Sequence, residues 1–387
     1  MKRILQVVCG YYPQIGGIEQ VARDISRALK TDFNLEQKII CFNENAESKE
    51  IVCRRSETVT DVVDGVEVTR CGCIAKIASQ LISLSYPLEL KKLMKSFNPD
   101  IVIFHYPNPY LALFLIPILK KKSKLVVYWH LDITKQKLLG KLFHFQNLRI
   151  LNRADRLIAT TPLYISGSKY LSRYKQKCSV IPCQIDLNRI KESSASNAIS
   201  KKISAENKGK TICFCLGRHV PYKGYKYLIE AAKYLDDTFK IYIGGSGPLT
   251  ENLKEQARSL TNIEFLGRIS DCELVAYFSA CDIICFPSIT KNEAFGISLI
   301  EGMYFGKPAV TFTIPGSGVN YVNLDGVTGI ECPNGDSKAY AEALKKLADD
   351  QELREKYGQA ARQRVLDNFT EEIFEKNLMK LIGELDG

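Results

Sequence analysis

The sequence predicts an α/β protein with two domains, each built around a mostly parallel β-sheet. At 387 residues the chain is too long for one ordinary hydrophobic core, and it suits two domains of roughly 150 to 200 residues each. Short apolar runs alternate with stretches of helical periodicity, which is the pattern of repeated βα units. This alternation restarts near Thr211, after a polar segment at 191–209 that we interpret as a solvated loop following an interdomain link at 182–189.

Apolar runs in the first half predict a series of strands separated by helical stretches. Strands are expected at Lys2–Cys9, Leu35–Phe42, Val66–Arg70, Ile101–His105, Leu125–Trp129, Arg156–Thr160 and Ser179–Ile181. A helix is expected over Ile18–Lys30, where apolar residues recur at helical spacing. The polar residues 43–64 are expected to form a mobile loop.

The second half repeats the pattern. Strands are expected at Thr211–Leu216, Lys240–Ile243, Ile263–Leu266, Asp282–Phe286 and Ala309–Thr313, and helices at Tyr225–Tyr234, Leu274–Ala280, Ile297–Tyr304, Ser337–Leu347, Gln351–Leu366 and Glu371–Leu385. Glycines follow several of these strands, at the sheet edge where open α/β folds bind ligands. The cluster Gly244–Pro248 lacks the G-x-G-x-x-G spacing of a nicotinamide-cofactor site, so no such cofactor is expected.

Positive charge is concentrated in the first half of the chain. Residues 1–190 hold 29 Lys and Arg against 16 Asp and Glu, a net charge of +13, whereas residues 191–387 hold 24 against 27, a net charge of −3. This asymmetry indicates an anionic partner for the first half, either a membrane surface, a nucleic acid or a phosphorylated substrate. A solvated basic face without a partner is the alternative. We find no nucleic-acid-binding motif, so a nucleic-acid partner is not expected.

Composition narrows the class of protein. With 45% hydrophobic and 25% charged residues, the chain has the composition of a globular protein. Its thirteen cysteines include no C-x-x-C pair and are expected to be buried, reduced thiols in a cytosolic protein. The apolar run after Met1 is expected to be a first strand and not a signal peptide. The run Ile101–Leu119 contains His105, Asn108 and three prolines, so it is not expected to span a membrane.

Two glutamates flank a predicted junction between a strand and a helix. Glu293 falls in the loop after the strand Asp282–Phe286, and Glu301 falls in the helix Ile297–Tyr304. The free N–H groups at the start of that helix attract oxygen-rich or anionic ligands. This stretch is therefore predicted to bind a polyhydroxylated, phosphorylated ligand.

A phosphate site is predicted at the end of the strand Thr211–Leu216. Arg218 and Lys223 stand there among Gly217 and Gly224, just before a helix. Arginine offers a planar fork of donors and lysine a point charge, and each charge-assisted hydrogen bond contributes about 1.5 to 3 kcal/mol. Simple surface solvation is the alternative for each residue alone.

Two strand ends in the first half carry histidines. His130 and Asp132 follow the buried strand Leu125–Trp129 and are predicted to be functional, whereas His105 is more readily explained as a structural residue. The following segment, 134–149, mixes apolar and basic residues like an amphipathic helix. It suits contact with a membrane surface or, equally, packing on the domain's own sheet.

Taken together, these motifs resemble the retaining family-four glycosyltransferases of the GT-B fold. In chain order the matching motifs are Gly16-Gly17-Ile18-Glu19, Trp129-His130-Leu131-Asp132, Gly217-Arg218-x4-Lys223-Gly224, Gly245-x-Gly247-Pro248, Phe265-Leu266-Gly267, and Glu293-x7-Glu301. The ordered set is highly specific and covers nearly the whole chain. The resemblance implies two Rossmann-like domains with a cleft between them. We expect an acceptor-side domain at 1–185 and a nucleotide-sugar-binding domain at 186–387, with the last helix (about 370–387) packing back on the first.

The resemblance also implies residue roles. Arg218 and Lys223 would hold the donor pyrophosphate, Glu301 the ribose hydroxyls, and Glu293 the transferred sugar, with His130 near that sugar. The other expected substrate-binding residues are Gly16, Gly17, Asp132, Gly247, Gly267, Arg268, Ala294, Phe295, Gly296 and Ile297. His219 departs from the apolar residue expected at its position, which affects the predicted shape of that loop. No metal is expected, because the chain contains no Asp-x-Asp pair and protein cations would do the work of Mg²⁺.

The function that the resemblance implies is transfer of a hexose from a nucleotide sugar to a lipid-linked oligosaccharide of a bacterial surface polysaccharide, such as an O-antigen. Mannose from GDP-mannose is the favoured donor, and UDP-hexoses are alternatives. The enzyme would be cytoplasmic and would associate peripherally with the inner face of the membrane through its basic first half. The other hypotheses are a GT-B phosphorylase or epimerase, and a non-catalytic protein that binds nucleotide sugars or polysaccharide.

Overall fold

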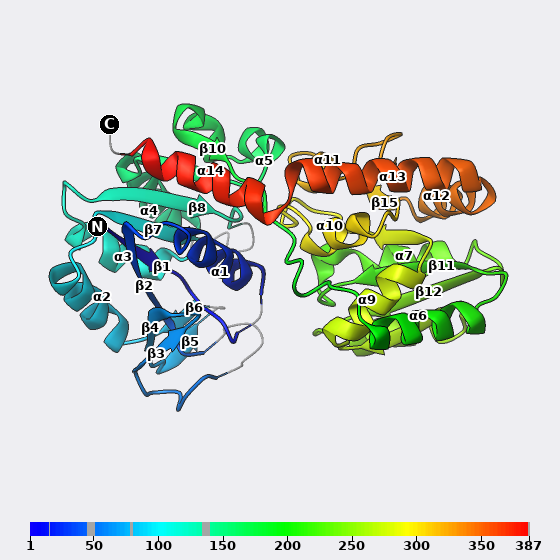
Figure 1. Ribbon diagram of the computed structural model, residues 1–387, viewed down its shortest axis with the longest axis horizontal. Helices are drawn as coiled ribbons and strands as arrows, with labels where there is room; N and C mark the ends of the chain where they lie inside the picture. The colour runs from blue at the N-terminus through cyan, green and yellow to red at the C-terminus, as the bar shows by residue number, and fades with distance from the viewer. Residues whose placement is uncertain (15, 45–50, 78–79, 134–139, 386–387) are drawn as a thin grey trace. The chain divides into compact units, whose positions relative to one another are not determined.

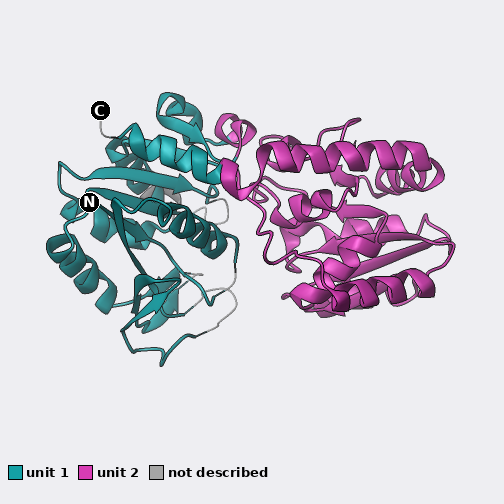
Figure 2. Cartoon of the chain, viewed as in Figure 1, with its two compact units in different colours: residues 1–160, 168–181, 374–387 teal, residues 161–167, 182–373 magenta. Residues whose placement is uncertain are grey.

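The computed structural model describes residues 1–14, 16–44, 51–77, 80–133 and 140–385. The chain divides into two compact units (Figure 2). Unit 1 consists of Met1–Thr160, Ser168–Ile181 and Phe374–Gly387, and unit 2 consists of Thr161–Gly167 and Pro182–Ile373. Among the described residues, no helix has the length and apolar character needed to cross a lipid bilayer.

Unit 1 is built on an eight-stranded sheet, counted over its described residues, in the order β10-β9-β8-β7-β1-β2-β4-β3 (Figure 1). The strands are β1 (Lys2–Val7), β2 (Leu35–Phe42), β3 (Val59–Val63), β4 (Val66–Cys71), β7 (Ile101–Tyr106), β8 (Lys124–Trp129), β9 (Arg156–Ala159) and β10 (Cys178–Val180). All neighbours pair in parallel except β3 and β4. The strands predicted in this half are therefore present, within one or two residues of their expected ends.

The helices of unit 1 lie between its strands in the sequence, except the last, α14, which ends the chain. They are α1 (Gly17–Leu29), α2 (Ser85–Ser96), α3 (Pro109–Ile118) and α4 (Gly140–Arg153), together with the part of α14 (Glu371–Gly383) that follows Ile373. A small separate hairpin pairs β5 (Ala75–Ile77) with β6 (Gln80–Ile82). The prediction of a loop throughout 43–64 is wrong at its end, where β3 turns through Asp64 and Gly65 into β4. Both turn residues have positive φ, of 50° and 79°, which suits a tight hairpin.

Unit 2 is built on a fully parallel sheet, six-stranded over the described residues, in the order β13-β12-β11-β14-β15-β16. The strands are β11 (Thr211–Leu216), β12 (Phe239–Gly244), β13 (Ile263–Gly267), β14 (Ile283–Phe286), β15 (Ala309–Phe312) and β16 (Gly329–Cys332). The helices of eight or more residues are α6 (Ser194–Glu206), α7 (Tyr225–Ala232), α9 (Asp271–Ala280), α10 (Ile297–Tyr304), α12 (Ser337–Asp349) and α13 (Gln351–Asn368). Shorter helical segments are α5 (Pro162–Gly167), η3 (Pro221–Lys223), α8 (Thr250–Gln256) and α11 (Val319–Val322).

One prediction for unit 2 is wrong, because the polar segment 191–209 contains helix α6 and is not a loop. A capping box starts this helix: Ser193 Oγ accepts from Ser196 N at 3.1 Å, and Ser196 Oγ accepts from Ser193 N at 2.8 Å. Ile203 is buried on one face while most of the helix is exposed, so a largely polar sequence can form this helix. The predicted α/β architecture of two Rossmann-like domains is otherwise confirmed.

Candidate functional site

The site residues predicted in the second half follow neighbouring strands of the unit 2 sheet. Arg218 comes after β11, Gly247 after β12, Arg268 after β13 and Glu293 after β14. Because these strands are adjacent and parallel, their carboxyl ends lie at the same edge of the sheet. The structure therefore places these residues at one edge of unit 2.

A buried ion pair lies at this edge. The Lys223 Nζ atom is 2.5 Å from Glu293 Oε2, and the two side chains are only 14% and 11% exposed. Ser288 Oγ donates a 3.0 Å hydrogen bond to the same Glu293 oxygen, and Ser317 Oγ donates to the Glu293 carbonyl. The lysine and the glutamate predicted as separate ligand contacts are thus held together.

Electrostatics keep Lys223 charged in this buried position. Burial is the largest influence and opposes the ammonium form, but Glu293, acting together with Tyr222 and Cys215, raises the Lys223 pKa above its ordinary value. The Nζ atom also lies 5.0 Å from the centre of the Phe286 ring, a favourable cation–π distance. Lys223 is therefore a fixed cation beside a carboxylate at neutral pH.

The loop that carries Lys223 requires a glycine at its end. Gly224 has φ of +68°, and a Cβ atom there would lie 2.0 Å from the carbonyl oxygen of Pro287. Any side chain would push η3 away from the end of β14. On the same loop Arg218 is half-buried, whereas Arg268, after β13, is exposed.

His219, which departs from the expected apolar residue, is fully buried and joins two loops of the site. Its Nδ1 atom lies 2.9 Å from Thr250 Oγ1, which accepts from Gly247 N at 2.8 Å. A Cβ atom on Gly247 would lie 2.6 Å from the His219 carbonyl oxygen, so the two backbones approach closely. His219 thus connects the loop after β11 to Gly247, and the backbones of these two loops stay in close contact.

The segment before α10 brings its backbone to the same edge. Gly296 has φ of +103° and is the N-cap of α10, which begins at Ile297. Phe295 is buried and packs edge-on against Phe369 at 5.3 Å, and Ala294 is half-buried. Ser298 Oγ donates a 3.1 Å hydrogen bond to the Leu216 carbonyl, which fixes α10 against the end of β11.

Glu301 lies on α10, is 2% exposed, and has a partner that the sequence did not indicate. The Arg189 guanidinium contacts Glu301 Oε1 through Nη1 and Asp271 Oδ1 through Nε, the latter at 2.9 Å. Burial raises the Glu301 pKa to about 7, and the positive charge of Arg189 acts in the opposite direction. Glu301 is therefore a carboxyl group that titrates near neutral pH.

In unit 1, His130 follows β8 and is buried against His105, which lies on β7. His130 Nε2 is 3.0 Å from His105 Nδ1, and His105 Nε2 is 3.1 Å from Gln6 Oε1. Asp132 is also buried, and its Oδ1 atom accepts from Trp129 Nε1 at 2.9 Å and from Ser168 Oγ at 2.8 Å. These two hydrogen bonds give Asp132 a structural role beside any role in binding.

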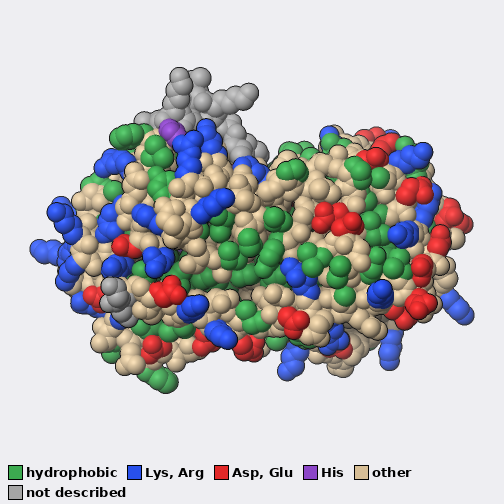
Figure 3. Space-filling model, turned by 90° about the horizontal axis from the view of Figure 1, so that it is seen from above, with side chains coloured by type: hydrophobic (Ala, Val, Ile, Leu, Met, Phe, Trp, Pro, Cys, Tyr) green, Lys and Arg blue, Asp and Glu red, His purple; other side chains and the backbone are tan. Residues whose placement is uncertain are grey.

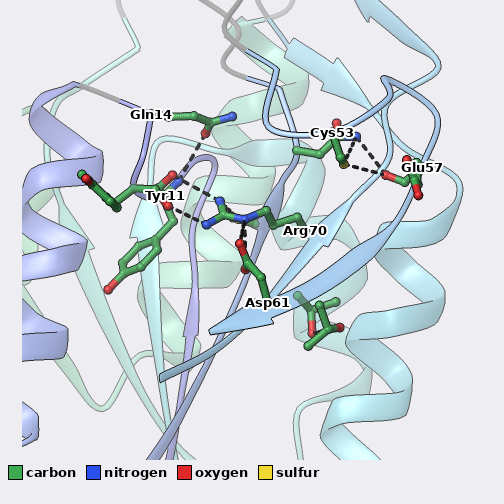
Figure 4. Close-up of polar contacts among 11 residues, drawn as sticks. Tyr11, Gln14, Cys53, Glu57, Asp61 and Arg70 are labelled. Carbon is green, nitrogen blue, oxygen red and sulfur yellow. Dashed lines mark hydrogen bonds and ion pairs between the residues drawn. The ribbon is translucent and has the colours of Figure 1, made fainter. Parts of the chain in front are cut away.

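The glycine loop between β1 and α1 is anchored by a buried arginine (Figure 4). Arg70, which is 0% exposed, donates through Nη1 to the Tyr11 carbonyl at 3.3 Å and through Nη2 to the Tyr12 carbonyl at 2.5 Å. Its Nε atom lies 3.0 Å from Asp61 Oδ2. The loop ends at Gly16, the N-cap of α1, and Gly17, the first residue of that helix.

We predict that Arg70→Met lowers the free energy of unfolding of unit 1 by about 3 kcal/mol, because two backbone carbonyls lose a charged donor. The single tryptophan of the chain, Trp129, is fully buried in unit 1, so its fluorescence in a urea titration reports on this unit. Lys92→Met is the control, since its pair with Glu89 is exposed and is expected to contribute less than about 1 kcal/mol. Equal losses in the two variants would contradict the anchoring role.

The predicted amphipathic segment 134–149 lies partly outside the described residues. Helix α4 starts at Gly140, with Phe145 exposed and Ile150 buried. On the face of unit 1 drawn in Figure 3, lysine and arginine side chains predominate over acidic ones, in agreement with the charge excess of the sequence. Within the part of the chain that the structure describes, no group of three or more His, Cys, Asp or Glu residues could hold a metal ion.

Several residues of the site were missed from the sequence. Three of them are far in sequence from the side chains or backbone they contact, or meet them only through the folded loops: Arg189, Ser288 and Ser317. Two others lie on strands, where they were read as ordinary polar residues: Gln6 and Arg70. A charged or polar residue inside an apolar strand, as at Gln6 and Arg70, is the one signal that could have identified them.

Comparison with known proteins identifies the family of the chain. A family model described as "Glycosyl transferases group 1" matches residues 196–364, and "Glycosyltransferase Family 4" matches residues 15–189. The chain is 29% identical to O-antigen chain mannosyltransferase C of Escherichia coli, over 95% of this chain and 94% of the relative. It is 32% identical to the D-rhamnosyltransferase WbpZ of Pseudomonas aeruginosa, over 76% of this chain and 77% of the relative. The solved structure of sucrose-phosphate synthase from Thermosynechococcus elongatus is similar in fold, with a TM-score of 0.79 at 18% identity, over 100% of this chain and 99% of that one.

Proposed function

The chain belongs to the GT-B glycosyltransferases of surface polysaccharide synthesis, with Glycosyltransferase Family 4 and group 1 regions, and from this premise we propose that it transfers a hexose from a nucleotide sugar to a growing lipid-linked oligosaccharide. Transfer proceeds with retention of configuration and without a metal ion, as the family resemblance implies. The donor that we favour is GDP-mannose. The mannosyl- and rhamnosyltransferase names of its relatives support this choice.

The observation that carries the proposal is the buried pair of Lys223 and Glu293 at the edge of the unit 2 sheet. A lysine kept charged by a carboxylate is a preorganised cation in surroundings with little water, where its electrostatic effect is strong. The start of α10 contributes the positive end of a helix dipole at the same edge. Such an arrangement suits a group on which negative charge increases during reaction.

Departure of a nucleoside diphosphate creates this charge. As the bond between the sugar C1 and the phosphate oxygen breaks, negative charge develops on the diphosphate and positive charge on the sugar. In this proposal Lys223 and Arg218 stabilise the diphosphate. The Glu293 carboxylate accepts hydrogen bonds from sugar hydroxyls and stabilises the positive charge on the sugar ring. The acceptor hydroxyl attacks the face that the diphosphate leaves and gives its proton to the departing phosphate oxygen, so no protein nucleophile is assigned.

The other site residues have binding roles in this proposal. Glu301 accepts hydrogen bonds from the ribose hydroxyls, and His130 contacts the transferred sugar. The remaining substrate-binding residues are Gly16, Gly17, Asp132, Gly247, Gly267, Arg268, Ala294, Phe295, Gly296 and Ile297.

A thermal-shift panel of nucleotide sugars, followed by product analysis, tests the proposal. The panel contains GDP-mannose, UDP-glucose and UDP-galactose, and the donor that binds most tightly is expected to raise the melting temperature most. Incubation with that donor and a lipid-linked oligosaccharide should lengthen the oligosaccharide by one sugar. A sugar phosphate or an epimer as product would indicate the phosphorylase or epimerase, and binding without turnover on any acceptor would indicate a non-catalytic protein.

We predict that the protein binds anionic membranes through its basic first half. At low salt it should float with vesicles containing about 30% anionic lipid, because each Lys or Arg near the surface contributes about 1 kcal/mol. Raising the salt should release it, since screening weakens this attraction. Neutral vesicles are the control. If the protein does not float with anionic vesicles at low salt, it does not associate peripherally with the cytoplasmic face of the membrane, and that part of the proposal is wrong.

A further inference from the structure

Three polar side chains form a buried row across neighbouring strands of unit 1. Gln6 stands on β1, His105 on the adjacent β7, and His130 directly after β8, which is the next strand of the sheet. Their exposed fractions are 0%, 1% and 7%. Gln6 Oε1 lies 3.1 Å from His105 Nε2, and His105 Nδ1 lies 3.0 Å from His130 Nε2. The row is therefore a continuous hydrogen-bond chain that ends at His130.

The chemistry of the row sets its direction. The Gln6 carbonyl oxygen can only accept, so the contacting His105 Nε2 carries the proton. Burial lowers the His105 pKa to about 3, so this ring is neutral and its Nδ1 is an acceptor. Nε2 of His130 must then be the donor. Burial lowers the His130 pKa as well, so its own Nδ1 keeps a free lone pair.

Aromatic stacking fixes the two imidazole rings in their planes. The Tyr128 ring lies 4.4 Å from the His130 ring and 6.0 Å from the His105 ring, at interplanar angles of 19° and 5°. The Tyr128 hydroxyl donates a 3.1 Å hydrogen bond to the Ile181 carbonyl, so this ring is itself anchored. Turning either ring out of its plane would break this stack, and a half-turn within the plane would break a hydrogen bond of the row.

Burial of these three polar side chains lowers the stability of unit 1, so their presence requires an explanation. Three amide or imidazole groups are taken out of water, and within the described residues the Gln6 Nε2 atom is buried without a hydrogen-bond partner. Apolar side chains would fill the same space at lower cost. The row ends at His130, whose Nδ1 is an acceptor in this tautomer, at the carboxyl edge of the sheet where ligands bind.

We propose that Gln6 and His105 are positioning residues that hold His130 in the tautomer with its proton on Nε2, so that Nδ1 accepts a hydrogen bond from a hydroxyl of the transferred sugar. The last clause rests on the proposed function, whereas the tautomer follows from the hydrogen bonds of unit 1 alone. A sugar hydroxyl is a donor that this acceptor can select, and a pre-set tautomer avoids the loss of orientation on binding.

Nitrogen NMR tests the tautomer without any substrate. The chain contains four histidines, so ¹⁵N-labelled histidine gives a spectrum that single replacements of His144 and His219 simplify for assignment. At pH 6.5 we expect His105 and His130 both to be neutral, with the proton on Nε2. Gln6→Leu should convert His130 into a mixture of tautomers. A proton on His130 Nδ1 in the unaltered protein, or no change in Gln6→Leu, would overturn the proposal.

Kinetics test the role of the row in transfer. His105→Leu removes the acceptor for His130 Nε2 and should lower kcat/KM for the donor roughly tenfold, while His105→Gln retains an acceptor oxygen and should restore most of it. Trp129 fluorescence establishes that both variants are folded. Equal losses in the two variants would overturn the positioning role. If the unaltered protein transfers no sugar, the proposed function fails, and the NMR result still decides the tautomer.

Discussion

Lys223→Met is expected to reduce sugar transfer by roughly 100- to 1,000-fold, the effect of removing one preorganised charge stabiliser from a transition state. The reason is the position of the Lys223 ammonium, which is held at the edge of the unit 2 sheet by Glu293 and is the cation assigned to the departing diphosphate. Rates with the preferred donor, measured at saturation and at low concentration, separate the loss in kcat from the loss in affinity. The larger loss should be in kcat.

A stability effect must be distinguished from this catalytic one. Removing Lys223 leaves the buried Glu293 carboxylate without its partner, which typically costs about 3 to 5 kcal/mol. Lys223→Met combined with Glu293→Gln removes both charges and should regain most of the stability without regaining transfer. Calorimetry measures the first property and product formation the second.

Lys240→Met is the matched control. Lys240 forms a pair of similar length, 2.7 Å, with Glu264, but Glu264 is 50% exposed. This control variant should keep both its stability, to within about 1 kcal/mol, and its activity. Normal turnover of Lys223→Met, or an equal loss of turnover in Lys240→Met, would contradict the role of Lys223.

The sequence contained most of the fold because apolar runs mark buried parallel strands wherever they occur. The strand β11 was predicted with its correct ends, as was helix α10, whose start is set by Gly296. Helix α6 was misread, since its serines serve as a capping box and not as loop residues. Strand β16 was not predicted, because Gly329 and Glu331 interrupt the apolar run by which the other short strands were recognised.

The candidate site was predicted in parts. Each of Lys223 and Glu293 was recognised by its place after a strand, but their pairing depends on how two loops meet in space. The partner of Glu301 was beyond reach, because Arg189 lies 112 residues away in the sequence and no local pattern connects them. His105 was expected to be structural, and only the distance to His130 gives it a further role.

The contact of Arg189 with Glu301 leads to the most specific prediction for nucleotide binding. Glu301→Gln is expected to weaken binding of the nucleotide sugar about 100-fold, because hydrogen bonds to an ionised carboxylate contribute about 1.5 to 3 kcal/mol. Glu264→Gln, which changes an exposed glutamate of the same unit, is the control and should bind normally. Calorimetric titration measures both affinities, and normal binding by Glu301→Gln would exclude the ribose role.

The pH dependence of that binding distinguishes a carboxylate from any other acceptor. Since burial raises the Glu301 pKa to about 7, the group is protonated below neutral pH in the free protein and ionises above it. The ionised form is the better acceptor for ribose hydroxyls, so affinity should increase about tenfold from pH 6 to pH 8, as the ionised fraction rises from roughly a tenth to nine tenths. Glu301→Gln should show no such increase. Arg189→Met removes the charge that lowers this pKa, so its curve should move to higher pH, and a shift to lower pH would contradict the assigned pair.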